Sequence, residues 1–117
     1  MEKQRMSQAD QAVLLWPMLA LAAQNEQILS YARVAGLTGI AQQGLGEALN
    51  LIHQYCKKRG YPLLNSLVVS RETGLPGDGF PEKIDNPGQI FVEQAKVFVF
   101  DWSGKDKPRS QDFEGQK

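Results

Sequence analysis

The residue types that most often carry out catalysis are rare in this sequence. It contains one histidine, His53, and one cysteine, Cys56, both on a predicted helix. A catalytic base needs a partner, and the nearby carboxylate of Glu47 lies at a poor offset on that helix. One cysteine and one histidine cannot supply a Cys/His zinc site. We therefore predict no catalytic residue, no metal, no cofactor and no enzymatic activity. His53 is interpreted as an exposed or partly packed helix residue, and Cys56 as a small apolar filler.

The only run of basic residues is Lys57, Lys58 and Arg59. A run of this kind can contact nucleic-acid phosphates, but cations at a helix C-terminus are also favoured by the helix dipole without any ligand. Arg71 adds a cation on the segment that follows. We predict that these four residues contact a DNA backbone, with a solvated helix end as the alternative.

Polar residues near the start of the same helix are candidates for reading bases. Gln42, Gln43 and Glu47 face outward if Ile40 and Leu45 face inward. A glutamine side chain can recognise adenine in the major groove. Glutamine is equally a common surface residue, so exposure without a ligand is the alternative.

Asn65 and Ser66 stand at the start of a predicted strand, where they are candidates for lining a pocket. The alternative is that they satisfy the backbone of the turn between helix and strand. The glycine-rich segment 73–79 lacks the lysine and following Ser or Thr of a phosphate-binding P-loop, so we interpret it as a turn or wing tip. Glu72 and Asp78 make that tip acidic.

Capping residues and hydrophobic spacing predict two helices in the first third of the chain. Ser7 is the predicted N-cap of a helix over 8–24, which Pro17 kinks or divides. Ser30 is the predicted N-cap of a short helix over 31–35.

The remaining elements are a long helix, a hairpin and a last helix. Thr38 is the predicted N-cap of a helix over 39–58. Two adjacent valines predict a strand over 65–70, with Phe80 returning as a second strand. A final helix is predicted over 87–102, with a strand as the alternative because the run 97–100 (VFVF) also suits a strand.

This order of elements is typical of a winged helix-turn-helix. The predicted fold class is mainly α with a small β-hairpin, a winged helix-turn-helix plus a C-terminal helix. We expect one domain over 8–102, a flexible N-terminus over 1–7 and a flexible tail over 103–117.

Composition supports one ordinary domain of 117 residues. Thirteen basic residues balance thirteen acidic ones, which argues against a polybasic binder, although clustered cations can still attract nucleic acid. A single cysteine excludes a disulfide scaffold and favours a reducing, cytoplasmic location. The longest apolar stretch, 12–23, is too short to cross a bilayer and contains Pro17, so we predict no membrane association.

Three segments carry a family resemblance. They are 28–36 (ILSYARVAG), 41–49 (AQQGLGEAL) and 62–80 (PLLNSLVVSRETGLPGDGF). The first resembles the segment before a first turn, the second a recognition helix with a glycine at Gly46, and the third a strand and glycine-rich wing. In these segments the chain resembles the DNA-binding half of O6-alkylguanine-DNA alkyltransferases and alkyltransferase-like proteins. The resemblance implies a winged-helix fold and a duplex DNA ligand.

The reactive cysteine motif of that family is absent. The family places Pro-Cys-His-Arg before two valines, and here Asn65 stands in the cysteine's place. Alkyl transfer needs an activated thiolate, and Cys56 lies on the preceding helix, so we predict no alkyl transfer. Gln43 stands near the position of the arginine that the family wedges into the base stack.

The sequence therefore predicts a non-enzymatic protein that binds duplex DNA through the helix near 39–58 and the wing near 65–80. The alternative is a protein-binding adaptor or inhibitor, such as a small phage or mobile-element protein that blocks a host defence machine. It would act through the acidic C-terminal half, because 72–93 holds five acids and one lysine. The aromatic residues between 98 and 102 are predicted to form core or a homodimer face.

Overall fold

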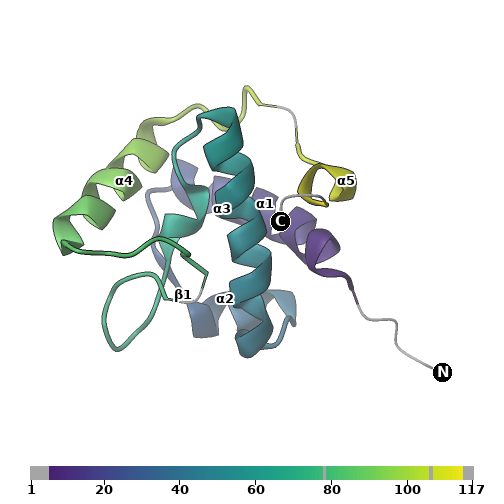
Figure 1. The fold of residues 1–117 in the computed structure, drawn as a ribbon, viewed down its shortest axis with the longest axis horizontal. Coiled ribbons are helices and arrows are strands. Elements are labelled where there is room, and N and C mark those ends of the chain that lie inside the picture. The colour runs from purple at the N-terminus through teal and green to yellow at the C-terminus, as the bar shows by residue number, and fades with distance from the viewer. Residues whose placement is uncertain (1–5, 78, 106, 115–117) are drawn as a thin grey trace.

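The computed structural model describes residues 6–77, 79–105 and 107–114, and this part of the chain is mainly helical (Figure 1). The predicted flexible N-terminus, 1–7, lies outside the described residues except for its last two. The elements in chain order are α1 (Gln8–Gln24), β1 (Leu29–Ser30), α2 (Tyr31–Thr38), the 3₁₀ turn η1 (Gln42–Gly44), α3 (Leu45–Arg59), the 3₁₀ turn η2 (Leu64–Leu67), β2 (Val68–Val69), α4 (Pro87–Val99) and α5 (Ser110–Phe113).

The core is built around α1 and α3, which cross in Figure 1 with α4 and α5 on opposite sides. Each of the two helices buries apolar residues at intervals of three or four, which gives it one apolar stripe. On α1 these residues include Ala12, Leu15, Leu19 and Ala22; on α3 they include Leu45, Leu49, Ile52 and Cys56.

An aromatic cluster joins the end of the chain to this core. The Trp16 ring lies 5.4 Å from that of Tyr55, 5.6 Å from that of Trp102 and 6.4 Å from that of Phe113, measured between centroids. Phe113 is fully buried. The predicted loose tail over 103–117 is therefore wrong for α5, because one aromatic side chain anchors an otherwise polar segment. Residues 106 and 115–117 lie outside the described residues.

The small sheet differs from the predicted hairpin. β1 and β2 pair in parallel, with Leu29 opposite Val68 and Ser30 opposite Val69. The first half of the predicted strand is the turn η2, and Phe80 belongs to no strand. The hairpin prediction was wrong because β-branched residues favour an extended chain without choosing its partner. The extended residues before α2 supply that partner instead.

α2 begins as predicted and ends later. The Ser30 hydroxyl accepts the N–H of Arg33 at 3.0 Å, which caps the helix. The helix continues through Gly36 and stops at Gly39, whose φ of 78° suits glycine. Of Gly36 and Gly39, only Gly39 adopts the left-handed conformation.

α3 begins later than predicted. Thr38 does not cap it: its hydroxyl donates to the Val34 carbonyl at 2.8 Å and accepts the N–H of Ile40 at 3.1 Å. The helix starts at Leu45, after η1, and ends at Arg59, one residue beyond the predicted end at 58, with Gly60 as its C-cap. The side chains of η1 are therefore exposed at the N-terminal end of α3.

The other two long helices keep their predicted starts. Ser7 caps α1 by accepting the N–H of Asp10 at 3.0 Å, and α1 is continuous through Pro17, which lies on its exposed side. Asn86 caps α4, and α4 ends at Val99, three residues earlier than expected. Within the described ranges, no helix combines the length and the hydropathy needed to span a membrane.

Candidate nucleic-acid interface

A hollow opens at the N-terminal end of α3. Its volume is about 460 Å³, and its walls come from the starts of α2 and α3 and from the segment after β2. The lining residues are Tyr31, Gln42, Gln43, Gly46, Ser70 and Gly77. Gln42 and Gln43 are exposed there, so the structure brings both predicted base-reading glutamines to the rim of one hollow.

Tyr31 holds in place the glycine-containing loop that forms one wall of this hollow. Its hydroxyl accepts the N–H of Gly77 at 2.9 Å and that of Gly79 at 3.1 Å. These bonds join the first residue of α2 to a loop more than forty positions later in the chain. The loop is therefore held against the start of α2.

A second hollow of about 500 Å³ lies on the other side of the α2 N-terminus. Arg33 and Arg71 line it together with Ser30 and the residues just before it. Among the described residues, neither arginine forms an ion pair. Ser30 and Tyr31 are chain neighbours, as are Ser70 and Arg71, so consecutive residues of the same two segments contribute to the two hollows. Arg71 thus directly follows Ser70, which lines the hollow of the predicted glutamines, and Arg33 is a cation that the sequence analysis missed.

Glu47 lies beside the same end of α3. It is exposed and lines a shallow hollow with Gln43, Gly46, Asn50 and Pro81. A carboxylate repels phosphate but accepts hydrogen bonds from a cytosine amino group. Its position suits contact with a base better than contact with a backbone.

The basic run lies at the opposite end of α3. Fifteen residues separate Gln43 from Lys58, which corresponds to about 22 Å along a helix axis. The Lys57 ammonium is paired with the Glu82 carboxylate, and the Arg59 guanidinium lies 4.9 Å from the centre of the Tyr55 ring. The structure therefore does not bring Lys57, Lys58 and Arg59 together with the glutamines and Arg71.

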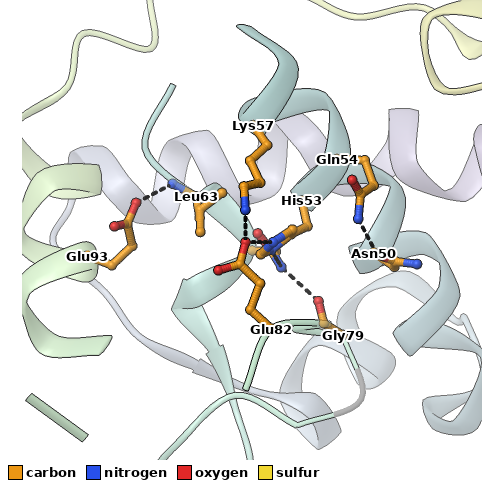
Figure 2. Close-up of polar contacts among 9 residues, drawn as sticks. Asn50, His53, Gln54, Lys57, Leu63, Gly79, Glu82 and Glu93 are labelled. Carbon is orange, nitrogen blue, oxygen red and sulfur yellow. Dashed lines mark hydrogen bonds and ion pairs between the residues drawn. The ribbon is translucent and has the colours of Figure 1, made fainter. Parts of the chain in front are cut away.

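His53 is buried, which corrects the prediction of an exposed or partly packed residue. Its Nε2 lies 2.8 Å from Glu82 Oε2, and the side chain of Lys57 donates to the same oxygen (Figure 2). The Asn65 amide donates to the Gly79 carbonyl at 2.7 Å and to His53 Nδ1 at 3.2 Å. With Nδ1 accepting, Nε2 carries the proton and donates to Glu82. Both ring nitrogens are thus hydrogen-bonded, Nδ1 to the buried Asn65 amide and Nε2 to the partly exposed Glu82 carboxylate.

The prediction missed this network because its acid is 29 positions away. Within the sequence, the carboxylate nearest to His53 on its own helix is that of Glu47. The loop containing Glu82 folds back over α3, and only the tertiary structure shows that contact. Lys57 and His53, in that order of effect, hold the pKa of the Glu82 carboxyl below its usual value.

Asn65 and Ser66 are buried beneath the surface and are not among the residues that line the two hollows. Asn65 holds the loop at Gly79 and the imidazole of His53. The Ser66 carbonyl accepts the side-chain amide of Gln94 at 2.8 Å. The Asn65 side chain thus ties the segment before β2 to α3 and to the loop at Gly79, whereas Asn65 Oδ1 and the Ser66 hydroxyl are buried without a hydrogen-bond partner among the described residues.

Cys56 is buried in the core, as the sequence indicated. Burial raises the pKa of its thiol to about 12, so the thiolate is scarce near neutral pH. In the described part of the chain, no cluster of His, Cys, Asp and Glu side chains could hold a metal ion.

The acidic C-terminal half uses several of its carboxylates internally. Glu82 is paired with Lys57 and His53, and Glu93 accepts the N–H of Leu63 at 2.8 Å. Asp85 lies 3.6 Å from Lys83. Asp78, predicted to make the loop tip acidic, lies outside the described residues. The acidic C-terminal half is therefore a weaker candidate for a protein-docking surface than its amino-acid composition indicated.

Comparisons with known proteins return no match: no family model fits the chain, and neither curated proteins nor solved structures resemble it closely enough to be matched. The resemblance to alkyltransferases stays a prediction from the sequence.

Proposed function

We propose that this protein binds duplex DNA without catalysing a reaction, through the surface at the junction of α2 and α3. In this proposal α2, the turn after it and α3 act as a helix-turn-helix unit. The observation that carries the proposal is the pair of hollows to which consecutive residues of the same two segments contribute, one lined by Gln42 and Gln43 and the other by Arg33 and Arg71.

The residues of the two hollows suit two different kinds of DNA contact, one to the backbone and one to the bases. Arginine binds phosphate through a planar fork of donors, so Arg33 and Arg71 would contact the DNA backbone. Glutamine can donate to and accept from an adenine edge, so Gln42 and Gln43 would contact bases. Glu47 would bias the adjacent base toward cytosine.

The proposal limits the role of the basic run. Lys57 and Arg59 already have partners, and Lys58 lies about 22 Å from the glutamines by helix length. Two arginine–phosphate contacts imply a log–log dependence of affinity on salt with a slope of about −1.8 for duplex DNA. A larger slope would mean that cations beyond Arg33 and Arg71 take part.

Fluorescence anisotropy of a labelled duplex of about 20 base pairs with random sequence, titrated at several salt concentrations, tests the proposal. We expect salt-sensitive binding that Arg33→Glu/Arg71→Glu weakens at least about tenfold. The matched control is Lys58→Glu, which reverses an exposed charge at the far end of α3 and is expected to change affinity much less. Absence of binding at low salt, or equal weakening by the control, would refute the proposed surface.

A further inference from the structure

The buried imidazole of His53 has a hydrogen-bond partner at each ring nitrogen. On one side, Nε2 lies 2.8 Å from a carboxylate oxygen of Glu82, which also accepts the Lys57 ammonium (Figure 2). On the other side, Nδ1 lies 3.2 Å from the side-chain nitrogen of Asn65. The Phe80 ring stands at 88° to the imidazole, with centroids 4.9 Å apart. Within the described residues, the charged groups at this imidazole are therefore one carboxylate and one ammonium group.

The orientation of the Asn65 amide decides which form of the imidazole fits. Its nitrogen lies 2.7 Å from the carbonyl oxygen of Gly79, and a carbonyl oxygen only accepts hydrogen bonds. The group at that position is therefore the amide NH₂, which also donates to His53 Nδ1. Nδ1 must then carry no proton. The surroundings thus match the neutral imidazole with its proton on Nε2.

A second proton, on Nδ1, would set two donors against each other. A half-turn of the Asn65 amide removes this conflict, because Oδ1 then takes the place of the nitrogen and accepts the Nδ1–H of His53. Asn65 Oδ1 is buried with no hydrogen-bond partner among the described residues, so no bond of its own resists the turn. The same turn places Oδ1 against the Gly79 carbonyl oxygen, where two acceptors repel. Protonation of His53 therefore costs the bond that holds Gly79.

We propose that protonation of His53 is a switch that turns the Asn65 amide and releases the carbonyl of Gly79. Histidine is the side chain that ordinarily changes charge between about pH 5 and 8, so the switch operates as the pH falls through that range. The Lys57 ammonium, and to a lesser extent His53, holds the pKa of the Glu82 carboxyl below its usual value. Glu82 is therefore ionised throughout this range and retains the imidazolium through Nε2–H, whereas Lys57 opposes the added charge.

Gly79 connects this switch to the hollow at the start of α3. Its N–H donates to the Tyr31 hydroxyl at 3.1 Å, and Tyr31 lines that hollow together with Gln42 and Gln43. An effect of His53 protonation on DNA affinity would rest on the proposed function, whereas the rearrangement at Gly79 does not. The test therefore follows the protein alone, without DNA.

Nuclear magnetic resonance follows both ends of the switch in one sample. His53 is the only histidine of the chain, so its imidazole Cε1–H signal reports its charge directly. Protein labelled with ¹⁵N is titrated from about pH 8 to about pH 5. We expect the Gly79 amide signal to move with the same midpoint as the imidazole signal. After correction for the intrinsic rate at each pH, we also expect the Gly79 amide to exchange at least about tenfold faster when His53 is charged.

Three variants locate the coupling. In His53→Gln, the new amide has an N–H to donate to Glu82 but gains no charge, so the Gly79 signal is expected to stop responding to pH over this range. In Asn65→Leu, His53 is expected to titrate while Gly79 no longer follows it. Asp78, the chain neighbour of Gly79, lies outside the described residues, and Asp78→Asn is the matched control that is expected to keep the coupling. Circular dichroism verifies that each variant is folded.

The titration of the original protein decides the proposal even if a variant does not fold. An imidazole that keeps one charge state across the range would overturn it, as would a Gly79 signal that does not follow the imidazole. A Gly79 response that persists in His53→Gln, or that disappears in Asp78→Asn, would assign the pH dependence to another group and would also overturn it.

Discussion

Replacing Gly79 by alanine tests how tightly the loop after β2 is packed on α3. A Cβ at this position would lie 2.7 Å from both Cβ and Cδ1 of Leu49. Leu49 is fully buried, so its side chain has little room to move. The carbonyl of Gly79 also accepts the Asn65 amide at 2.7 Å, and its N–H donates to Tyr31 at 3.1 Å. Any shift that relieves the clash therefore strains two hydrogen bonds.

The expected loss of stability follows from these contacts. Overpacking a core position costs about 1–3 kcal/mol, and each weakened hydrogen bond adds up to about 1 kcal/mol. We expect Gly79→Ala to lower the free energy of unfolding by about 2–4 kcal/mol. For a chain of this length, that corresponds to a fall in melting temperature of about 4 °C per kcal/mol.

Gly77→Ala is the matched control in the same loop. A Cβ there would lie 3.6 Å from the Tyr31 ring, which is an ordinary contact, and the residue also donates its N–H to Tyr31. The free energy of unfolding of Gly77→Ala is expected to change by no more than about 1 kcal/mol. Alanine restricts the unfolded chain more than glycine does, which favours a small gain. The two variants thus separate close packing from the general effect of losing a glycine.

Urea denaturation followed by far-ultraviolet circular dichroism measures both variants, with an unchanged m-value as the check that the unfolded states are comparable. Leu49→Ala supplies a further check, because it removes Cγ and Cδ1, two of the three Leu49 atoms that the new Cβ meets, and leaves only Cβ. In that background the cost of Gly79→Ala is expected to shrink. Equal stability of Gly79→Ala and Gly77→Ala would refute the close approach of this loop to α3.

Two further predictions concern the end of the chain and the loop over α3. Phe113→Ala is expected to lower the free energy of unfolding, measured by urea denaturation, by about 3–5 kcal/mol because the ring is fully buried. Gln111→Ala, at an exposed position of the same helix, is expected to leave it nearly unchanged. A small loss in both variants would contradict the packing of α5. In the folded protein the pKa of the Glu82 carboxyl is lowered, chiefly by Lys57. The ionised carboxylate therefore stabilises the fold at pH values above the pKa of the unfolded chain, which is about 4.3. This stabilisation is lost as the pH falls through the lower pKa of the folded protein. Glu82→Gln should therefore flatten the acid side of the stability–pH profile, and an unchanged profile would exclude this ion pair as a source of stability.

Local chemistry made much of the helical structure predictable. Ser7, Ser30 and Asn86 cap α1, α2 and α4 because a short polar side chain satisfies the first free N–H groups of a helix wherever it occurs. Gly60 ends α3 because the left-handed conformation favours glycine. These signals lie within a few residues of the elements that they define.

The sequence-based predictions were wrong where two segments distant in the chain contact each other. Val68 and Val69 predicted a strand correctly, but its partner at 29–30 could not be read from them. Phe113 gave no periodic signal, yet it completes the cluster around Trp16. His53 was assigned to a partly open surface because its partners come from residues 65 and 82.

The candidate surface divides in the same way. The sequence identified Gln42, Gln43 and Arg71 as binding candidates, because side-chain chemistry is carried by residue type. It also grouped them with the basic run at 57–59, which a long helix places about 22 Å from the glutamines. Only the fold brought Arg33 to Arg71 and Tyr31 to the glycines of the loop. The sequence by itself determined where α1, α2 and α4 begin and which side chains are binding candidates, since these depend on residue type and on neighbouring residues. The tertiary structure alone decided which of those side chains meet, since that depends on how apolar faces far apart in the chain pack together.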